Sequence, residues 1–120
     1  MQTASQLLPD GIAVREALER VRAGQFRTSL VTDRRGVIGV INLLRLEGEL
    51  PAAADKKLGE LVDGLDFPHV HSDQGLELAL ELMGANQLEI LPVVSRADVH
   101  KLEGIVTLRD VLDAYGVSRA

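Results

Sequence analysis

The same pattern of apolar residues occurs twice in the chain, 62 positions apart. Residues at positions i, i+3, i+4 and i+7 lie on one face of an α-helix, so each copy predicts an amphipathic helix with one buried side. The two sets are Val14, Ala17, Leu18 and Val21, and then Leu76, Ala79, Leu80 and Met83. We expect Asp10 or Gly11 near the start of the first helix, and Ser72 or Asp73 as the cap of the second.

Short runs of aliphatic residues follow the first helix, which should end near Gly24. They predict a strand over 28–32, a tight turn at 33–36 and a returning strand over 37–41. A short helix then begins at Leu43 and stops by Gly48.

The second half repeats this order. Strands are expected over 67–71, before the second amphipathic helix, and over 90–94 and 104–107 after it. Val111, Leu112 and Tyr115 then recur at helical spacing and predict a closing helix.

Both halves therefore follow the order strand, helix, strand, strand, helix. Two such copies predict a mixed α/β (α+β) fold, in which two pseudo-twofold-related repeats pack into one module with a cleft between them. We place the first repeat at residues 1–48, a linker with a short helix near 57–62 at residues 49–66, and the second repeat at residues 67–120.

The composition narrows the classes of protein that fit. A chain of 120 residues, 46% hydrophobic and 26% charged, is sized for one folded domain. Aromatic residues make up only 2%, so the core must be aliphatic. The net charge of −5, with no basic face, disfavours a nucleic-acid partner. Because there is no cysteine and no apolar run long enough to span a bilayer, we expect a soluble, cytoplasmic chain.

Catalytic motifs are missing from the sequence. It contains no Gly-rich phosphate loop, no GxGxxG after a strand, no nucleophile elbow and no zinc-protease motif. His69, His71 and Asp73 alternate and would share one face of a strand, a geometry that can bind a divalent metal. Surface or cleft histidines are the simpler interpretation. We therefore predict no metal site, no required cofactor and no enzymatic activity.

The stretch Gly104-Ile105-Val106-Thr107-Leu108-Arg109-Asp110 joins a strand to a helix and allows two interpretations. In the first, Thr107 and Asp110 form a capping box, with a hydroxyl at the helix start and a carboxylate three residues on. In the second, the same two side chains hold the hydroxyls of a ribose, and Gly104 lets a ligand approach the backbone. The two interpretations are compatible, because Thr107 can cap the helix while Asp110 turns outward.

This stretch resembles the signature of the paired CBS domain, also called a Bateman module, and the repeat extends the resemblance over nearly the whole chain. The second copy carries the match, with the strand Ile90-Leu91-Pro92-Val93-Val94 ahead of the signature. Three further stretches are most similar to the CBS pairs on the cytoplasmic tails of ClC chloride channels and transporters: Phe67-Pro68-His69-Val70-His71, Ala79-Leu80-Glu81-Leu82-Met83 and Asp113-Ala114-Tyr115-Gly116.

The resemblance implies a sensor of adenosine ligands, such as AMP, ADP or ATP, that regulates an attached protein. In the family the Thr and Asp of the signature bind ribose, which assigns that role to Thr107 and Asp110. The first copy departs from this pattern. Asn42 can still cap its helix, but Arg45 replaces the carboxylate, so Arg45 is either silent or available to a phosphate. At most one nucleotide site of the usual kind is therefore expected.

The family also places the base against the other repeat, near the entrance to its first hairpin strand. Here that region is Gln25, Phe26, Arg27 and Thr28. Phe26 either stacks on adenine or is a core residue at a helix-to-strand turn. Arg27 either meets a phosphate or is a solvated surface charge.

Two functions from different classes remain. The first is a regulatory module that binds an adenosine nucleotide in its cleft and biases a membrane channel or transporter. The second is a ligand-free dimerisation and interaction domain that anchors the tail of a larger protein. In that case apolar helix faces left over from each repeat would pack against a second copy to form a homodimer.

Overall fold

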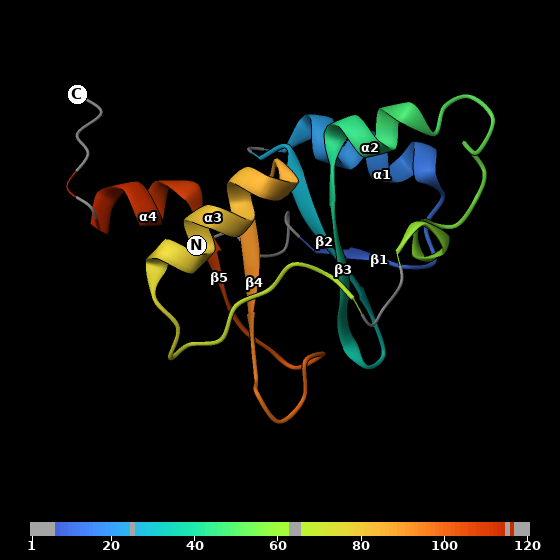
Figure 1. Cartoon of the computed structure of the whole chain (residues 1–120). Coiled ribbons are helices and arrows are strands. Elements are labelled where there is room, and N and C mark those ends of the chain that lie inside the picture. The colour runs from blue at the N-terminus through green and yellow to red at the C-terminus, as the bar shows by residue number, and fades with distance from the viewer. Residues whose placement is uncertain (1–6, 25, 63–65, 115, 117–120) are drawn as a thin grey trace.

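The computed structural model of the chain describes residues 7–24, 26–62, 66–114 and 116. Two sets of strands and helices follow one another along the chain (Figure 1). The first set contains β1 (Leu7–Pro9), α1 (Val14–Ala23), β2 (Thr28–Asp33), β3 (Gly36–Asn42) and α2 (Leu43–Gly48). After the 3₁₀ turn η2 (Leu58–Leu61), the second set contains α3 (Leu76–Asn86), β4 (Ile90–Val94), β5 (Leu102–Thr107) and α4 (Leu108–Ala114).

The two hairpins have matching registers. In each one, the first residue of the leading strand pairs with the residue just before the next helix: Thr28 pairs with Asn42, and Ile90 pairs with Thr107. A parallel pairing between β1 and β2 adds a third strand to the first hairpin. The start of α2 and the start of α4 therefore stand in equivalent places on the two sheets.

A bulge interrupts both hairpins at equivalent positions. It lies between Val31 and Thr32 in β2 and between Val93 and Val94 in β4, and it bends each strand locally. Figure 1 shows the helices along one side of the strands, with both hairpin turns directed to the other side. The predicted mixed α+β fold with two related repeats is confirmed. The predicted division at residues 1–48, 49–66 and 67–120 stays a prediction.

Aliphatic side chains form the core, as the composition predicts. One cluster lies within the first repeat around α1, where all four residues of the predicted inner helix face are buried. A second cluster lies within the second repeat around α3 and α4. A third joins the repeats through their strands and contains Leu30, Val37, Phe67, Ile90 and Val94. The hairpins thus hold the two halves together, while the helices cover each half.

The turns of the two hairpins also meet. The backbone N–H of Val37 donates to the carbonyl oxygen of His100 at 2.9 Å, and Nδ1 of His100 donates to the carbonyl oxygen of Val37 at 2.9 Å. Gly36, at a φ of +127°, lies so close that a Cβ there would stand 1.9 Å from the His100 carbonyl oxygen. Only glycine fits this position, on grounds of both space and backbone conformation.

The caps predicted for the two amphipathic helices, α1 and α3, are wrong. Helix α1 begins after Ala13 and helix α3 after Gly75, and neither residue caps its helix through a side chain. For α1 the reason is tertiary, because the linker supplies the missing acceptors. The N–H groups of Val14 and Arg15 donate to the carbonyl oxygens of Lys56 and Ala54, respectively. Backbone oxygens from a distant segment thus satisfy donors that a local side chain would otherwise take.

The strand predicted over 67–71 is reduced to a single parallel bridge between Val70 and Val93. Val70 exchanges backbone hydrogen bonds with Pro92 and Val94, at 3.1 and 2.9 Å. The pairing does not extend, because Pro68 has no N–H and the N–H of His71 donates to Oε1 of Gln74 at 2.8 Å. The segment therefore runs extended beside β4 without forming a ladder.

The predicted inner face of α3 is half right. Ala79 and Met83 are buried, whereas Leu76 and Leu80 are both 38% exposed. In the closing helix Val111 is buried and Leu112 half-buried, and Tyr115 lies outside the described residues. The linker turn expected near 57–62 is present as η2, and its Leu58 is fully buried in the first repeat.

Candidate functional site

Thr107 and Asp110 form the predicted capping box at the start of α4. The N–H of Asp110 donates to Oγ1 of Thr107 at 3.0 Å, and the N–H of Thr107 donates to Oδ2 of Asp110 at 3.1 Å. Asp110 is exposed and Thr107 is half-buried. The capping interpretation is thereby confirmed. It uses one carboxylate oxygen and leaves Oδ1 and the hydroxyl proton outside these two bonds.

Gly104 lies three residues before the end of β5 and pairs with Val93. A Cβ at this position would meet no heavy atom within 4 Å. The space beside this strand is therefore open, unlike the space at Gly36, where a side chain would collide with backbone.

A seam of hydrogen bonds centred on Glu89 joins the start of α4 to the first repeat. The N–H of Leu108 donates to the carbonyl oxygen of Glu89 at 2.7 Å. Oε1 of Glu89 accepts the N–H of Arg27 at 2.6 Å, and the N–H of Glu89 donates to Oγ1 of buried Thr28 at 3.3 Å. Glu89 thus links the two parts of the predicted site, the Thr107–Asp110 box and the Arg27–Thr28 strand entrance.

The seam borders a hollow of about 510 Å³ on the side of the first repeat. Its lining comes from the entrance of β2, the start of α2 and the loop before β4, and consists of Arg27, Thr28, Asn42, Leu43, Leu44, Glu47, Gln87 and Glu89. Two of the six predicted site residues, Arg27 and Thr28, therefore line this hollow. The other four, Gly104, Thr107, Asp110 and Phe26, are not among the residues that line it.

Asn42, which lines this hollow, makes hydrogen bonds within the first repeat and to the second. Its Oδ1 accepts the N–H of Arg45 at 2.8 Å and so caps α2, as predicted. Its Nδ2 donates to the carbonyl oxygen of Gln87 in the second repeat at 3.3 Å. The first repeat's signature has thus kept its cap and added a contact across the pseudo-twofold axis.

Arg27 contributes a positive charge to the lining of the hollow. Its side chain has no hydrogen bond or ion pair among the described residues. Arg45, by contrast, bonds to Glu49 at 3.3 Å and to the carbonyl oxygen of Leu61 at 3.1 Å, which ties α2 to the linker. Glu47 pairs with Arg22 at 2.9 Å. An anionic group in the hollow would therefore find its free positive charge at Arg27.

Phe26 packs as a core residue. It is half-buried and lies against the cluster that joins the two repeats, which includes Leu30 and Ile90. The core interpretation therefore describes its contacts. Gln25, the neighbouring position of the predicted base site, lies outside the described residues.

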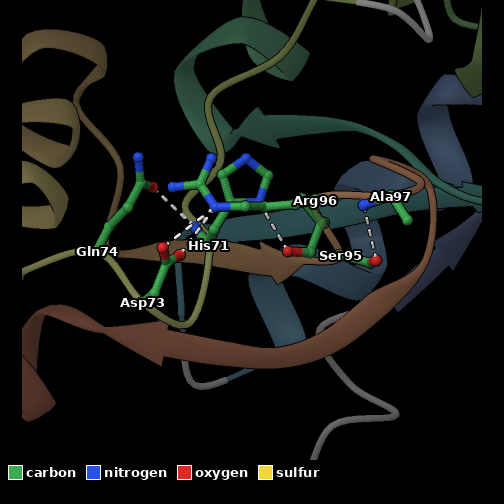
Figure 2. A network of polar contacts seen from close by, with 7 residues as sticks. His71, Asp73, Gln74, Ser95, Arg96 and Ala97 are labelled. Carbon is green, nitrogen blue, oxygen red and sulfur yellow. Dashed lines mark hydrogen bonds and ion pairs between the residues drawn. The ribbon is translucent and has the colours of Figure 1, made fainter.

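The alternating polar residues at the start of the second repeat, His69, His71 and Asp73, bond to different partners. Nδ1 of His71 donates to the carbonyl oxygen of Val94 at 2.9 Å, while Asp73 turns to Arg96, whose Nε lies 3.0 Å from Oδ1 (Figure 2). The hydrogen bond from Arg96 holds the pKa of Asp73 below its ordinary value of 3.8. In the described part of the chain, no group of three or more His, Cys, Asp or Glu residues is arranged to hold a metal ion.

Sequence reasoning missed Glu89, Asn42 as a cross-repeat donor, and Gln87. The signal for Glu89 was available, because it stands 62 positions after Arg27, at the equivalent strand entrance. The signal for Gln87 was not, since its left-handed backbone, at a φ of 57°, forms only where α3 ends.

The sequence and the fold of the chain were compared with those of known proteins. The CBS domain family matches residues 60–117. A CBS domain pair/ACT domain protein from Thermotoga maritima is 31% identical, with a TM-score of 0.74, over 99% of this chain and 94% of that one. This chain belongs to the CBS domain pair family. No curated protein sequence gave a match.

Two other structures extend the comparison of the CBS pair. The cytosolic domain of the Mg²⁺ channel MgtE, in complex with ATP, is 28% identical with a TM-score of 0.68, over 95% of this chain and 46% of that one. A CBS domain pair in complex with 5′-methylthioadenosine and S-adenosyl-L-methionine is 21% identical with a TM-score of 0.69, over 92% of this chain and 90% of that one. At 21% identity, the likeness to the second of these structures shows a shared fold and nothing more. Within its described residues, the CBS pair has no helix of the length and hydropathy needed to cross a membrane.

Proposed function

We propose that this CBS pair is a regulatory module that binds an adenosine nucleotide such as AMP, ADP or ATP at the seam between its repeats. The observation that carries the proposal is the Thr107–Asp110 box, whose exposed carboxylate is fixed in place. The box is joined through Glu89 to Arg27, whose side chain has no partner among the described residues. The likeness to the MgtE domain, which is in complex with ATP, supports the same ligand class.

The chemistry of the box suits a ribose. The capping bonds fix the Asp110 side chain in one orientation, so that Oδ1 can accept sugar hydroxyls without an added ordering cost. The Thr107 hydroxyl has a proton to donate, because its oxygen is the acceptor in the cap. The open space at Gly104 lets the ligand approach the strand.

Charge limits how many phosphates this site can hold. Arg27 is flanked by the carboxylates of Glu47 and Glu89 along the hollow, and the whole chain carries a net charge of −5. Each phosphate needs a local cation. We therefore expect a single phosphate to be met by Arg27, and affinity that does not increase from AMP to ATP.

The attached protein is proposed from the sequence resemblance. Phe67-Pro68-His69-Val70-His71 and Asp113-Ala114-Tyr115-Gly116 are most similar to the cytoplasmic tails of ClC-type chloride channels and transporters. The MgtE domain likewise belongs to a membrane channel. We propose a channel or transporter of the ClC type as the partner, with this module at the cytoplasmic face and no catalysis of its own. Coupling of this kind is typically about 1–3 kcal/mol.

Isothermal titration calorimetry of the full chain with adenosine, AMP, ADP and ATP tests the nucleotide proposal. Asp110→Ala should abolish the binding heat. Glu77→Ala is the matched control, because Glu77 is also an exposed acid in the first turn of a helix, at the start of α3. No heat with any of the four compounds, or equal binding by the wild type and the Asp110→Ala variant, would contradict the proposal.

A second candidate function, dimerisation, is favoured by apolar side chains left on the helices. Leu44 on α2 is 67% exposed, and Leu76 and Leu80 on α3 are each 38% exposed. A homodimer that packs these helix faces together would cover them. Sedimentation equilibrium should then show a dimer that Leu44→Glu weakens. A monomer at millimolar chain concentration would count against this function.

A further inference from the structure

Ring contacts connect the three histidines of the chain to buried Phe67, with His71 joined through His69. The ring centre of His69 lies 5.3 Å from that of Phe67 and 5.1 Å from that of His71. The ring centre of His100 lies 6.5 Å from that of Phe67. Neither the capping box nor the hollow beside Glu89 uses these side chains.

Each of these histidines bonds through the same ring nitrogen to a backbone carbonyl. Nδ1 of His69 lies 2.8 Å from the oxygen of Phe67, and Nδ1 of His71 lies 2.9 Å from the oxygen of Val94. A carbonyl oxygen only accepts, so Nδ1 carries the proton and Nε2 keeps its lone pair in the neutral ring. Figure 2 shows the second ring nitrogen of His71 directed away from the strand. Metal-binding histidines are oriented by this same kind of bond.

The separation of His69 and His71 matches a shared metal ion. Two imidazoles that each bind one tetrahedral Zn²⁺ through nitrogens at about 2.0–2.1 Å have their ring centres about 5 Å apart. The observed separation is 5.1 Å. Val70, between the two histidines, is bonded to β4 on both sides, so the backbone that carries the pair is held in place.

The space beside His69, and the charges near both histidines, also suit a hydrated cation, although His71 itself does not line the hollow. His69 lines a hollow of about 400 Å³ that also contains the exposed Asp66 and Asn86. Two residues after His71, Asp73 pairs with Arg96, whose Nε lies 3.0 Å from Oδ1 of the carboxylate. The carboxylate of Asp66 therefore adds negative charge on one side, and Asp73 offsets the positive charge on the other.

We propose that His69 and His71 form a two-histidine site that binds a transition-metal dication such as Zn²⁺ through their Nε2 atoms. Water completes the coordination, because the described residues offer no group of three ligands. His100 is left out of the site because, among the described residues, its ring contact is with Phe67 at 6.5 Å and not with His69 or His71. The site is independent of the nucleotide proposal, because it shares no residue with the Glu89 seam.

The test is a Zn²⁺ titration of the tag-free, ¹⁵N-labelled full chain at pH 7.5, followed through the imidazole ¹⁵N resonances. The Nε2 signals of His69 and His71 should shift together, while those of His100 stay in place. His69→Gln and His71→Gln should each lower the affinity at least about tenfold, and His100→Gln should leave it unchanged.

Circular dichroism and the unmoved His100 resonances show whether each variant is folded. The proposal is overturned if no Nε2 signal moves at millimolar Zn²⁺, or if the Nδ1 signals move instead. It is equally overturned if a folded His69→Gln variant binds Zn²⁺ as tightly as the wild type, or if His100→Gln weakens binding as much as His71→Gln.

Discussion

The backbone N–H of Arg27 donates to Oε1 of Glu89 at 2.6 Å, and this bond joins equivalent positions of the two repeats. Each residue stands at the entrance of its hairpin, and each carbonyl oxygen accepts the first helical N–H of the following helix. Leu43 donates to Arg27 and Leu108 donates to Glu89, both at 2.7 Å. The pair therefore fixes both helix starts and their relation to each other.

Removing the Glu89 carboxylate should separate the two helix starts. Glu89→Ala leaves the Arg27 N–H without its partner, and we expect the free energy of unfolding to fall by about 1–3 kcal/mol in urea denaturation. Glu89→Gln keeps an oxygen acceptor and should lose clearly less. Glu103→Ala, at an exposed position on β5, is the control and should change stability little. Equal stability of the Glu89→Ala and Glu103→Ala variants would show that the seam does not stabilise the fold.

An added methyl group should change the stability of the protein at one hairpin glycine and leave it unchanged at another. Gly36→Ala forces a Cβ against the His100 carbonyl at a positive φ, and should lower the free energy of unfolding by at least about 2 kcal/mol. Gly104→Ala meets no atom within 4 Å and should leave stability nearly unchanged. If Gly104 faces the nucleotide, the same Gly104→Ala variant should weaken AMP binding in calorimetry. Thermal denaturation that ranks the two variants alike would contradict the hairpin joint.

The capping box can be tested apart from any ligand. Thr107→Ala removes the acceptor for the Asp110 N–H and should cost about 0.5–2 kcal/mol in denaturant unfolding. Thr107→Ser keeps the hydroxyl and should preserve both stability and ribose binding. A Thr107→Ala variant as stable as the Thr107→Ser variant would mean that α4 does not depend on its cap.

The Asp73–Arg96 pair predicts a dependence on acid pH. The hydrogen bond from Arg96 lowers the pKa of Asp73 in the folded chain relative to the unfolded one. The pair therefore favours folding above the unfolded pKa of about 3.9. That contribution is lost as the pH falls through the lower folded value. Arg96→Ala should raise the pKa of Asp73 towards 3.8 in an NMR titration of the carboxyl carbon. Arg109→Ala, which removes another exposed arginine, should not shift it.

The internal repeat could be predicted from the sequence, because each copy is defined by residues close together in the chain and the same pattern recurs 62 positions later. The helix faces, the two hairpins, the cap at Asn42 and the capping box at Thr107–Asp110 all depend on residues a few positions apart. The same reasoning failed at the start of α1, where the acceptors for Val14 and Arg15 come from the linker, about forty positions further on. The residues near the start of α1 do not indicate that backbone oxygens of the linker will accept these N–H groups.

In the candidate site, too, the sequence predicted some residues correctly and missed a placement that depends on distant segments. Arg27 and Thr28 were expected near a ligand and line the hollow beside the seam, whereas Phe26, from the same stretch, packs into the cluster between the repeats. A single aromatic at a turn has no periodic pattern that could decide between these two places. Burial was decided by Leu30 and Ile90, which arrive from different strands.

By itself, the sequence determined that two like halves exist, which segments form their helices and hairpins, and where each closing helix begins. These features follow from spacing and from side chains that bond within three or four residues. Only the tertiary structure decided that Glu89 bridges the halves, that Phe26 packs between them, and that Leu76 and Leu80 remain exposed. Those outcomes depend on which surfaces meet when the halves pack, and contacts between distant segments leave no period in a single chain.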